Sequence, residues 1–235
     1  SYDSWQRGKD YYTEGIFVWL DVDTKIRELT RGKRSLDDFA RAFFGIEDGR
    51  IEPLTYTVDD VVATLNKVTP YDWASMLRAR LDGHGPGAPL DGLARGGWRV
   101  AFKDEPSPSE KEADSADGTR SFLHSLGVIL NKDGKVGELY WDSVAFKAGV
   151  APGMTIVAVN GKAYTHGRLQ EALKAAKADP QLPTELLVRS ADTFSTVNLD
   201  YHGGLRYPYL ARIEQTPDLL SSLLQPRLPM PAVKK

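Results

Sequence analysis

The histidine and cysteine side chains, which most often hold catalytic zinc, are few or absent in this chain. It contains no cysteine, which excludes disulfides, thiolate metal ligands and cysteine nucleophiles. None of its histidines belongs to an HExxH sequence, the spacing that places two imidazoles on one helix face to bind zinc. These histidines are His84, His124, His166 and His202. We therefore expect no metal site and no cofactor held by this chain alone.

A denser set of signals lies between residues 125 and 161. It consists of SLGV at 125–128, DSVAFKAGV at 142–150 and GMTIVAVNG at 153–161. In this order the three stretches resemble the carboxylate-binding loop, the "SPAxxAGL" turn and the "GDxIxxVNG" segment of PDZ domains. The resemblance implies a small β-rich domain with two helices that binds an extended peptide or a chain end.

The PDZ resemblance implies a groove between one strand and one helix. A peptide would add to the open strand edge, and Gly127 would let the loop turn its amides toward a terminal carboxylate. Leu126 and Val128 would line the pocket for the last side chain of the peptide. Leu169 and Leu173 would face them from the helix, because residues four apart share a face. The groove is predicted to prefer apolar ligand residues. Ordinary core packing of these side chains, or occupation of the groove by the protein's own tail or loop, are open alternatives.

Two patterns of apolar residues surround these motifs. Up to residue 82 the helical spacing of apolar residues predicts helices over 10–31, from 35, from 57 and over 73–81. Ser35 and Thr57 each stand three positions before an acidic residue, which is typical of a capping box. From residue 126 short apolar runs predict strands at 126–130, 136–141, 154–159, 186–189 and 196–199, with a helix at about 167–177.

The segments between and after these halves have other compositions. Residues 83–97 are rich in glycine and proline, which predicts a linker or a long loop. Residues 104–118 carry six acids and one lysine, which predicts an exposed, mobile loop without a function. Strands are predicted at 98–102 and 207–213, and a short helix follows the second of them.

These patterns together predict an α+β protein, with an N-terminal helical bundle followed by a PDZ-like small β-barrel or sandwich with two helices. The predicted parts are a helical subdomain at 1–82, a linker at 83–119 that holds a candidate first PDZ strand at 98–102, a PDZ domain at 120–200 and a C-terminal tail at 201–235.

The helical half carries a second resemblance. Its residues are YYTEG at 11–15, LD at 20–21, IR at 26–27 and GKRSLDD at 32–38. As a series they resemble the C-terminal part of the glycyl aminopeptidase family, bacterial zinc metallopeptidases with a thermolysin-like catalytic domain followed by a PDZ domain. The resemblance spans roughly residues 1–200. It implies that the catalytic domain and its zinc lie upstream of Ser1, so that the isolated chain is inactive.

One catalytic element would remain in this chain. The Tyr-x-x-Gly sequence at 12–15 also resembles the segment of aminopeptidase N relatives that carries a transition-state tyrosine. By that resemblance Tyr12 is the candidate hydrogen-bond donor to the oxyanion at the metal. Tyr11 is the alternative, and packing of Tyr12 in a helix interface is equally open. Arg27 is expected to form a structural ion pair.

The bulk composition bears on the partners. The chain has 235 residues, 41% hydrophobic content and a formal net charge of −2, so nothing in it indicates a nucleic-acid partner. It has no apolar run of about 18 residues, so no membrane span is expected. The expected partners are a peptide or protein C-terminus and an upstream catalytic domain. The family resemblance, with the absence of cysteine, favours the periplasm or cell envelope over the cytoplasm.

Two other functions are known for proteins that contain PDZ domains. A PDZ-containing scaffold or adaptor without enzymatic activity is the alternative to the aminopeptidase. A PDZ-bearing serine protease is disfavoured, because the chain has no room for the large β-rich domain that holds a Ser/His/Asp triad.

Overall fold

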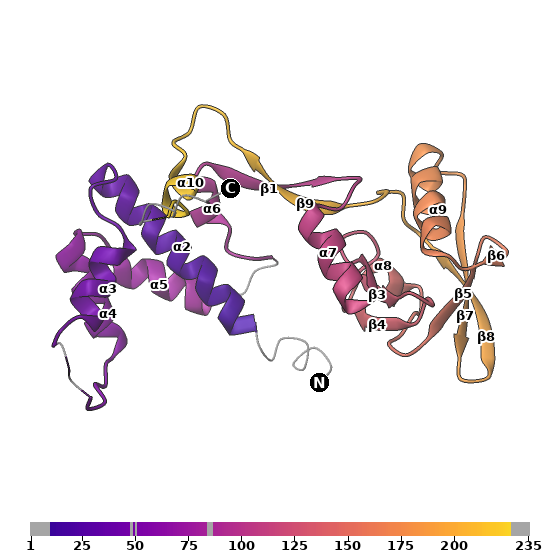
Figure 1. The fold of residues 1–235 in the computed structure, drawn as a ribbon, viewed down its shortest axis with the longest axis horizontal. Helices are drawn as coiled ribbons and strands as arrows, with labels where there is room; N and C mark the ends of the chain where they lie inside the picture. The colour runs from indigo at the N-terminus through magenta and orange to yellow at the C-terminus, as the bar shows by residue number, and fades with distance from the viewer. Residues whose placement is uncertain (1–9, 48, 50, 84–86, 227–235) are drawn as a thin grey trace, which may run out of the picture. The chain divides into compact units, whose positions relative to one another are not determined.

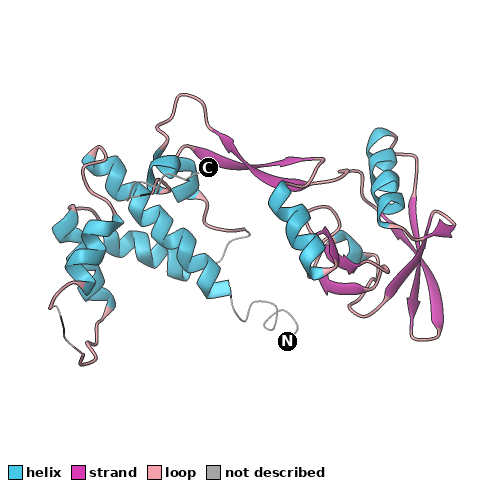
Figure 2. Ribbon diagram, viewed as in Figure 1, coloured by secondary structure: helices cyan, strands magenta, loops and turns pink. Residues whose placement is uncertain are grey.

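The computed structural model describes residues 10–47, 49, 51–83 and 87–226 (Figure 1). The chain divides into two compact units, one of Ser1–Arg99 with Leu210–Lys235 and the other of Val100–Tyr209. Helices make up most of the described part of the first unit, and the second combines sheets with helices (Figure 2). The protein is therefore α+β with N-terminal helices, as predicted. The unit boundaries at 99 and 209 differ from the predicted ones at 82, 119 and 200.

The first unit consists mainly of helices. They are α2 (Asp10–Thr30), α3 (Leu36–Phe44), α4 (Val58–Val68), α5 (Trp73–Asp82), α6 (Asp91–Arg95) and α10 (Leu219–Leu223). The four helices predicted before residue 82 are thus present as α2 to α5. Their apolar faces meet in one core, because each helix has an apolar stripe that is stabilised by burial. The buried side chains of this core are Val22, Ile26, Phe39, Leu65, Trp73 and Leu77.

Two of these helices begin with the predicted capping boxes. The Ser35 hydroxyl accepts a hydrogen bond from Asp37 N at 3.2 Å, and Ser35 N donates to the Asp38 carboxylate at 2.9 Å. The Thr57 hydroxyl accepts from Asp60 N at 3.3 Å, and Thr57 N donates to Asp60 at 2.8 Å. The same bonds from Ser35 and Thr57 lower the pKa of Asp38 and Asp60, because they stabilise the charged carboxylates.

A buried carboxylate joins three helices of the first unit. Asp21 of α2 is 0% exposed and accepts from Arg80 Nε of α5 at 3.0 Å and from an Arg95 nitrogen of α6 at 2.5 Å. Helix α6 packs so closely that a Cβ on Gly92 would lie 2.6 Å from the Asp21 Cα. Residues 83–97 were predicted as a linker or loop, and α6 lies within them. The contacts to α2 stabilise this short helix, which the glycine- and proline-rich composition of residues 83–97 does not predict.

The second unit contains seven strands beyond the β1–β9 ribbon described below. They are β2 (Thr119–Phe122), β3 (Val128–Asn131), β4 (Val136–Leu139), β5 (Thr155–Val159), β6 (Lys162–Ala163), β7 (Thr184–Ser190) and β8 (Thr193–Leu199). The antiparallel sheets have the orders β2-β3-β4 and β6-β5-β7-β8, and among the described residues neither closes into a barrel. The helices are α7 (Pro108–Asp117), α8 (Val144–Lys147) and α9 (His166–Ala178). The five predicted strands and the helix predicted at 167–177 are confirmed.

Both sheets and α9 contribute to the core of the second unit. Side chains alternate along a strand, so Val128 and Leu130 of β3 point inward while Ile129 between them stays half-exposed. Leu169 and Leu173 of α9 belong to the same buried cluster. The core therefore lies under the strand and the helix that were predicted to frame the groove.

Helix α7 occupies most of the segment that was predicted as a mobile loop. Ser107 forms a capping box with Glu110, Pro108 stands in the first turn, and Gly118 ends the helix with a φ of 63°. The acidic composition suggested a solvated loop, but these end signals define a surface helix. In the described structure none of its ten residues is buried.

Strands β1 (Trp98–Lys103) and β9 (Tyr207–Arg212) pair with each other in a two-stranded sheet. Both were predicted as strands. The first was a candidate PDZ strand, yet it pairs with β9 and not with the sheets of the second unit. The boundary between the units passes through both strands. After β9 the predicted short helix is present as α10, with Asp218 as its N-cap.

Candidate functional site

The loop between β2 and β3 contains the SLGV residues. Gly127 has a φ of +76°, and a Cβ at this position would overlap the Ser143 side chain at the start of α8. Only glycine combines that backbone conformation with so close an approach. The loop is further fixed by Ser125, whose hydroxyl accepts from Arg206 N at 3.0 Å. Its backbone shape is therefore set by packing on neighbouring segments.

Three backbone amides of this loop converge on one oxygen. Ser125 N, Leu126 N and Gly127 N donate to the carbonyl oxygen of Phe122 at 3.1, 2.8 and 3.1 Å. Such a concave set of amides suits a carboxylate, which has two oxygens and a full negative charge. In this structure the acceptor is the last residue of β2.

The four predicted pocket side chains lie together, and they are closed off from solvent. Leu126 and Val128 are each 1% exposed, and Leu169 and Leu173 are 0% exposed. Phe122, also 1% exposed, belongs to the same buried cluster. The structure thus brings the predicted residues into one buried cluster, which also contains Phe122, a residue outside the three PDZ-like motifs.

The strand edge predicted to receive a peptide is also paired. Strand β2 runs antiparallel to β3 along its length, with Thr119 opposite Asn131 and Phe122 opposite Val128. The other edge of β3 pairs with β4. Strand β3 is therefore the central strand of its sheet. Occupation of the groove by the protein's own chain was one of the alternatives left open by the sequence.

His166 lies beside this site and was missed by the sequence analysis. It is the first residue of α9, its ring centroid is 5.0 Å from that of Phe122, and its Nδ1 is buried without a hydrogen-bond partner among the described residues. Burial lowers the pKa of His166, Arg120 lowers it further, and Asp114 opposes both effects. His166 directly precedes the helix predicted at 167–177 and stands one turn before Leu169, and this spacing was the signal that could have found it.

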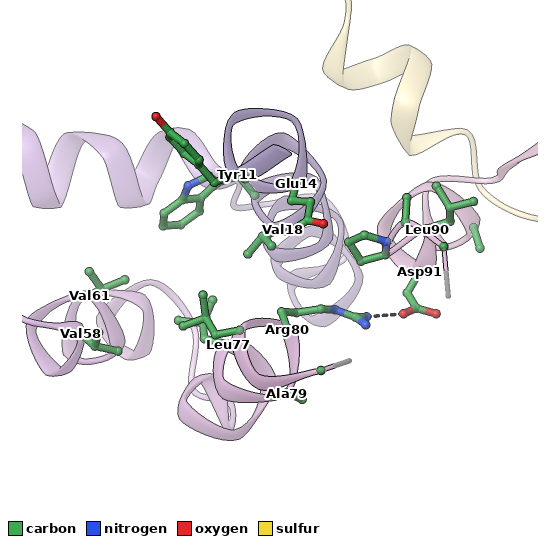
Figure 3. Close-up of a pocket in the computed structure, with 18 of the residues that line it drawn as sticks. Tyr11, Glu14, Val18, Val58, Val61, Leu77, Ala79, Arg80, Leu90 and Asp91 are labelled. Carbon is green, nitrogen blue, oxygen red and sulfur yellow. Dashed lines mark hydrogen bonds and ion pairs between the residues drawn. The ribbon is translucent and has the colours of Figure 1, made fainter. Parts of the chain in front are cut away.

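A second hollow lies entirely within the first unit. Its volume is about 1370 Å³, and its lining includes Tyr11, Glu14 and Val18 of α2 with Leu77 and Arg80 of α5 (Figure 3). Arg80 forms an ion pair with Asp91 at its edge (Figure 3).

The two candidate tyrosines lie at the start of α2. Tyr11 lines the hollow, whereas Tyr12 is 67% exposed and is not part of the lining. Their ring centroids are 4.3 Å apart, and the hydrogen bond with Tyr12 raises the pKa of Tyr11. Arg27 donates from Nε to Asp23 at 2.6 Å, and Asp23 also accepts Leu36 N at 2.7 Å. Arg27 is therefore in a structural ion pair, as expected.

The described residues do not fit a zinc site. In the ranges 10–47, 49, 51–83 and 87–226 no group of three or more His, Cys, Asp or Glu side chains is placed to hold a metal ion. His84 lies outside the described residues. Within the same ranges, no helix combines the length and the apolar character that crossing a membrane requires.

Comparison with known proteins gives matches among solved structures. Neither a protein-family model nor a curated protein matches the sequence. An aminopeptidase N family protein from Idiomarina loihiensis matches with a TM-score of 0.54 and 18% identity, over 92% of this chain and 36% of that one. At this identity the likeness shows the fold alone. This chain therefore has the fold of little more than a third of that protein.

A second match has a much lower TM-score. It is the HtrA3 PDZ domain bound to a phage-derived ligand, with a TM-score of 0.24 and 19% identity, over 49% of this chain and 91% of that domain. A TM-score this low does not establish a common fold.

Proposed function

We propose that this chain is the C-terminal portion of a PDZ-containing zinc aminopeptidase and that its second unit binds extended peptides. The observation that carries the first part is the fold shared with 36% of an aminopeptidase N family protein over 92% of this chain. The described residues offer no metal-binding cluster, so the proposal assigns the zinc to another part of the protein.

The peptide-binding part of the proposal rests on the loop between β2 and β3. Its three converging amides offer a site for a terminal carboxylate, and the buried side chains of Leu126, Val128, Leu169 and Leu173 form an apolar cluster that would take up the last side chain of the peptide. A peptide that ends in a large apolar residue would place its charge on the amides and its side chain in this cluster. Delivery of such peptides would raise their concentration near the catalytic domain.

Tyr12 keeps its proposed role as a transition-state stabiliser in the whole enzyme. Its side chain is 67% exposed at the N-terminal end of α2, so its phenol is accessible to a partner outside the described residues.

Peptide binding can be tested with fluorescence anisotropy on the full chain of 235 residues. We expect a labelled decapeptide ending in Phe with a free carboxylate to bind at least about tenfold more tightly than the same peptide ending in an amide, because the amide has no charge to place on the loop. Equal affinity for both peptides, or no affinity for either, would contradict the proposed site.

The enzymatic part needs a separate assay. The isolated chain, incubated with zinc and aminoacyl-p-nitroanilides, is expected to release no nitroaniline above the buffer rate, since the residues that the structure describes supply no metal site. Zinc-dependent hydrolysis by this chain alone would overturn the assignment of the metal to another domain.

A further inference from the structure

We infer that strand β2 is a displaceable internal ligand of the groove between β3 and α9. A peptide can bind in this groove only when Thr119–Phe122 has moved out of it. This inference rests on the proposed peptide-binding function. It adds that β2 controls access to the binding site. It also specifies the ligand as a peptide C-terminus whose last side chain is aromatic and takes the position of Phe122.

Strand β2 makes each kind of contact that a bound peptide would make. Its backbone pairs antiparallel with β3 from Thr119 to Phe122. Its last carbonyl accepts the three loop amides, and its last side chain is buried in one cluster with the predicted groove residues, opposite Val128 of β3 and 5.0 Å from the His166 ring of α9. Strand pairing, amide capture and a side-chain pocket are the elements of strand-addition binding. All three are supplied here by consecutive residues of the same chain.

The three donor amides of the loop are poorly matched to the single carbonyl oxygen that accepts them. A carbonyl oxygen has two lone pairs and no net charge, yet Ser125, Leu126 and Gly127 all donate to that of Phe122. A carboxylate would divide these donors between two oxygens, and charge-assisted hydrogen bonds are stronger than neutral ones. The loop is therefore better matched to a chain end than to the internal carbonyl that occupies it.

Apart from the pairing of β2 with β3, the segment of α7 and β2 has few buried contacts. In the described structure no residue of α7 is buried, and only Phe122 of the β2 residues is buried. Asp114 of α7 accepts from Ser121 N and from the Thr119 hydroxyl, both at 3.3 Å. Gly118, in the left-handed conformation, separates the helix from the strand. The pairing with β3, the buried Phe122 side chain and the bonds to Asp114 hold β2 in place, but β2 is an edge strand of its sheet, so its release leaves β3 paired with β4.

The inference can be tested by locking β2 in place. Ser121 N bonds to Asp114, so it points away from β3, and Ser121 and its partner Ile129 form a pair without mutual hydrogen bonds. Such pairs bring Cα atoms to about 4.5 Å, within the range of a disulfide. Both side chains are half-exposed on the face opposite the core, and the chain has no other cysteine. The double variant Ser121→Cys/Ile129→Cys can therefore be oxidised without a competing thiol.

A matched control locks a sheet position away from the groove. Glu185 N bonds to Asn160 on the side of β5, so Glu185 and its β8 partner Asn198 form an equivalent pair, and both are exposed. Anisotropy with the Phe-terminated decapeptide is measured for each double variant, oxidised and reduced. We expect oxidation of the 121–129 pair to weaken binding at least about tenfold, reduction to restore it, and the 185–198 pair to bind equally in both states.

A variant of Asp114 tests the opposite direction. Asp114→Ala is expected to tighten peptide binding about fivefold. The variant loses the two long hydrogen bonds that Asp114 accepts from β2, and this loss shifts the equilibrium toward the open state by about the contribution of one ordinary hydrogen bond. Glu112→Ala, which removes the same charge from an exposed position of α7, is expected to leave affinity unchanged. Both variants should keep the wild-type circular dichroism spectrum.

The outcomes separate this inference from the function beneath it. Binding that is unaffected by the 121–129 disulfide would overturn the internal-ligand inference and leave peptide binding intact. A Phe-terminated peptide that binds none of the proteins, Asp114→Ala included, would overturn the proposed peptide-binding function and the control of access by β2 with it. Weak peptide binding by the oxidised 121–129 variant, with recovery of affinity on reduction, supports both the inference and the proposed peptide-binding function.

Discussion

Replacing Asp21 by alanine should unfold the helical unit far more easily than replacing an exposed partner of an ion pair. Asp21 is 0% exposed and accepts from two guanidinium groups, those of Arg80 and Arg95. Removing one partner of a buried charge pair typically costs about 3–5 kcal/mol, since the remaining charge is left buried and unpaired. The variant therefore leaves two cations where one anion held three helices together.

The magnitude should fall at the lower end of that range. The side chains of Arg80 and Arg95 are 25% and 19% exposed, so both cations keep some contact with water. Arg80 also retains Asp91, and Arg95 retains Glu28 at 3.4 Å. We therefore expect Asp21→Ala to lower the free energy of unfolding of the first unit by about 3 kcal/mol.

Urea unfolding followed by tryptophan fluorescence measures this change. Four of the five tryptophans fall in the first unit, and Trp141 is the one in the second. A Trp141→Phe background therefore makes the signal specific for the first unit. The control is Arg34→Ala, whose side chain is 57% exposed beside Asp38 at 3.2 Å and should cost less than about 1 kcal/mol. A loss at Asp21 no larger than at Arg34 would refute the reasoning that the buried carboxylate joins these helices.

Two further predictions concern the second unit. Gly127→Ala is expected to cost about 3 kcal/mol, because the left-handed backbone penalty of about 1–2 kcal/mol adds to the overlap with Ser143. Gly153→Ala, with a φ of +87° and open space around its Cβ, should cost the backbone penalty alone, and equal losses in urea unfolding would argue against the overlap. Burial raises the pKa of Tyr164 to about 12, above its unfolded value of about 10. The unfolded state therefore loses this proton first, and the stability that Tyr164 contributes should be lost as pH rises from about 10 to 12. Tyr164→Phe should flatten that part of the stability profile, and an unchanged profile would contradict the assignment.

The sequence by itself determined the local elements wherever the signals were local. Ser35 with Asp38 and Thr57 with Asp60 specify helix starts within four residues, and alternation in β3 specifies which of its side chains are buried. The α7 start is equally local, through Ser107 and Glu110, but the prediction of a loop at 104–118 came from the acidic composition alone. Composition describes solvation, whereas capping describes backbone hydrogen bonds, and these need not agree.

The tertiary structure decided which residues meet. Nothing local to 91–95 predicts a helix, which forms where Arg95 reaches the buried Asp21. Likewise the motifs placed Leu126, Val128, Leu169 and Leu173 around one pocket, but they did not identify its occupant. Phe122 joins their buried cluster because a short hairpin pairs β2 with β3, and the Phe122 carbonyl accepts three amides of the hairpin loop. The edge of a strand is open or paired only in relation to the rest of the chain, so that choice is made by the fold.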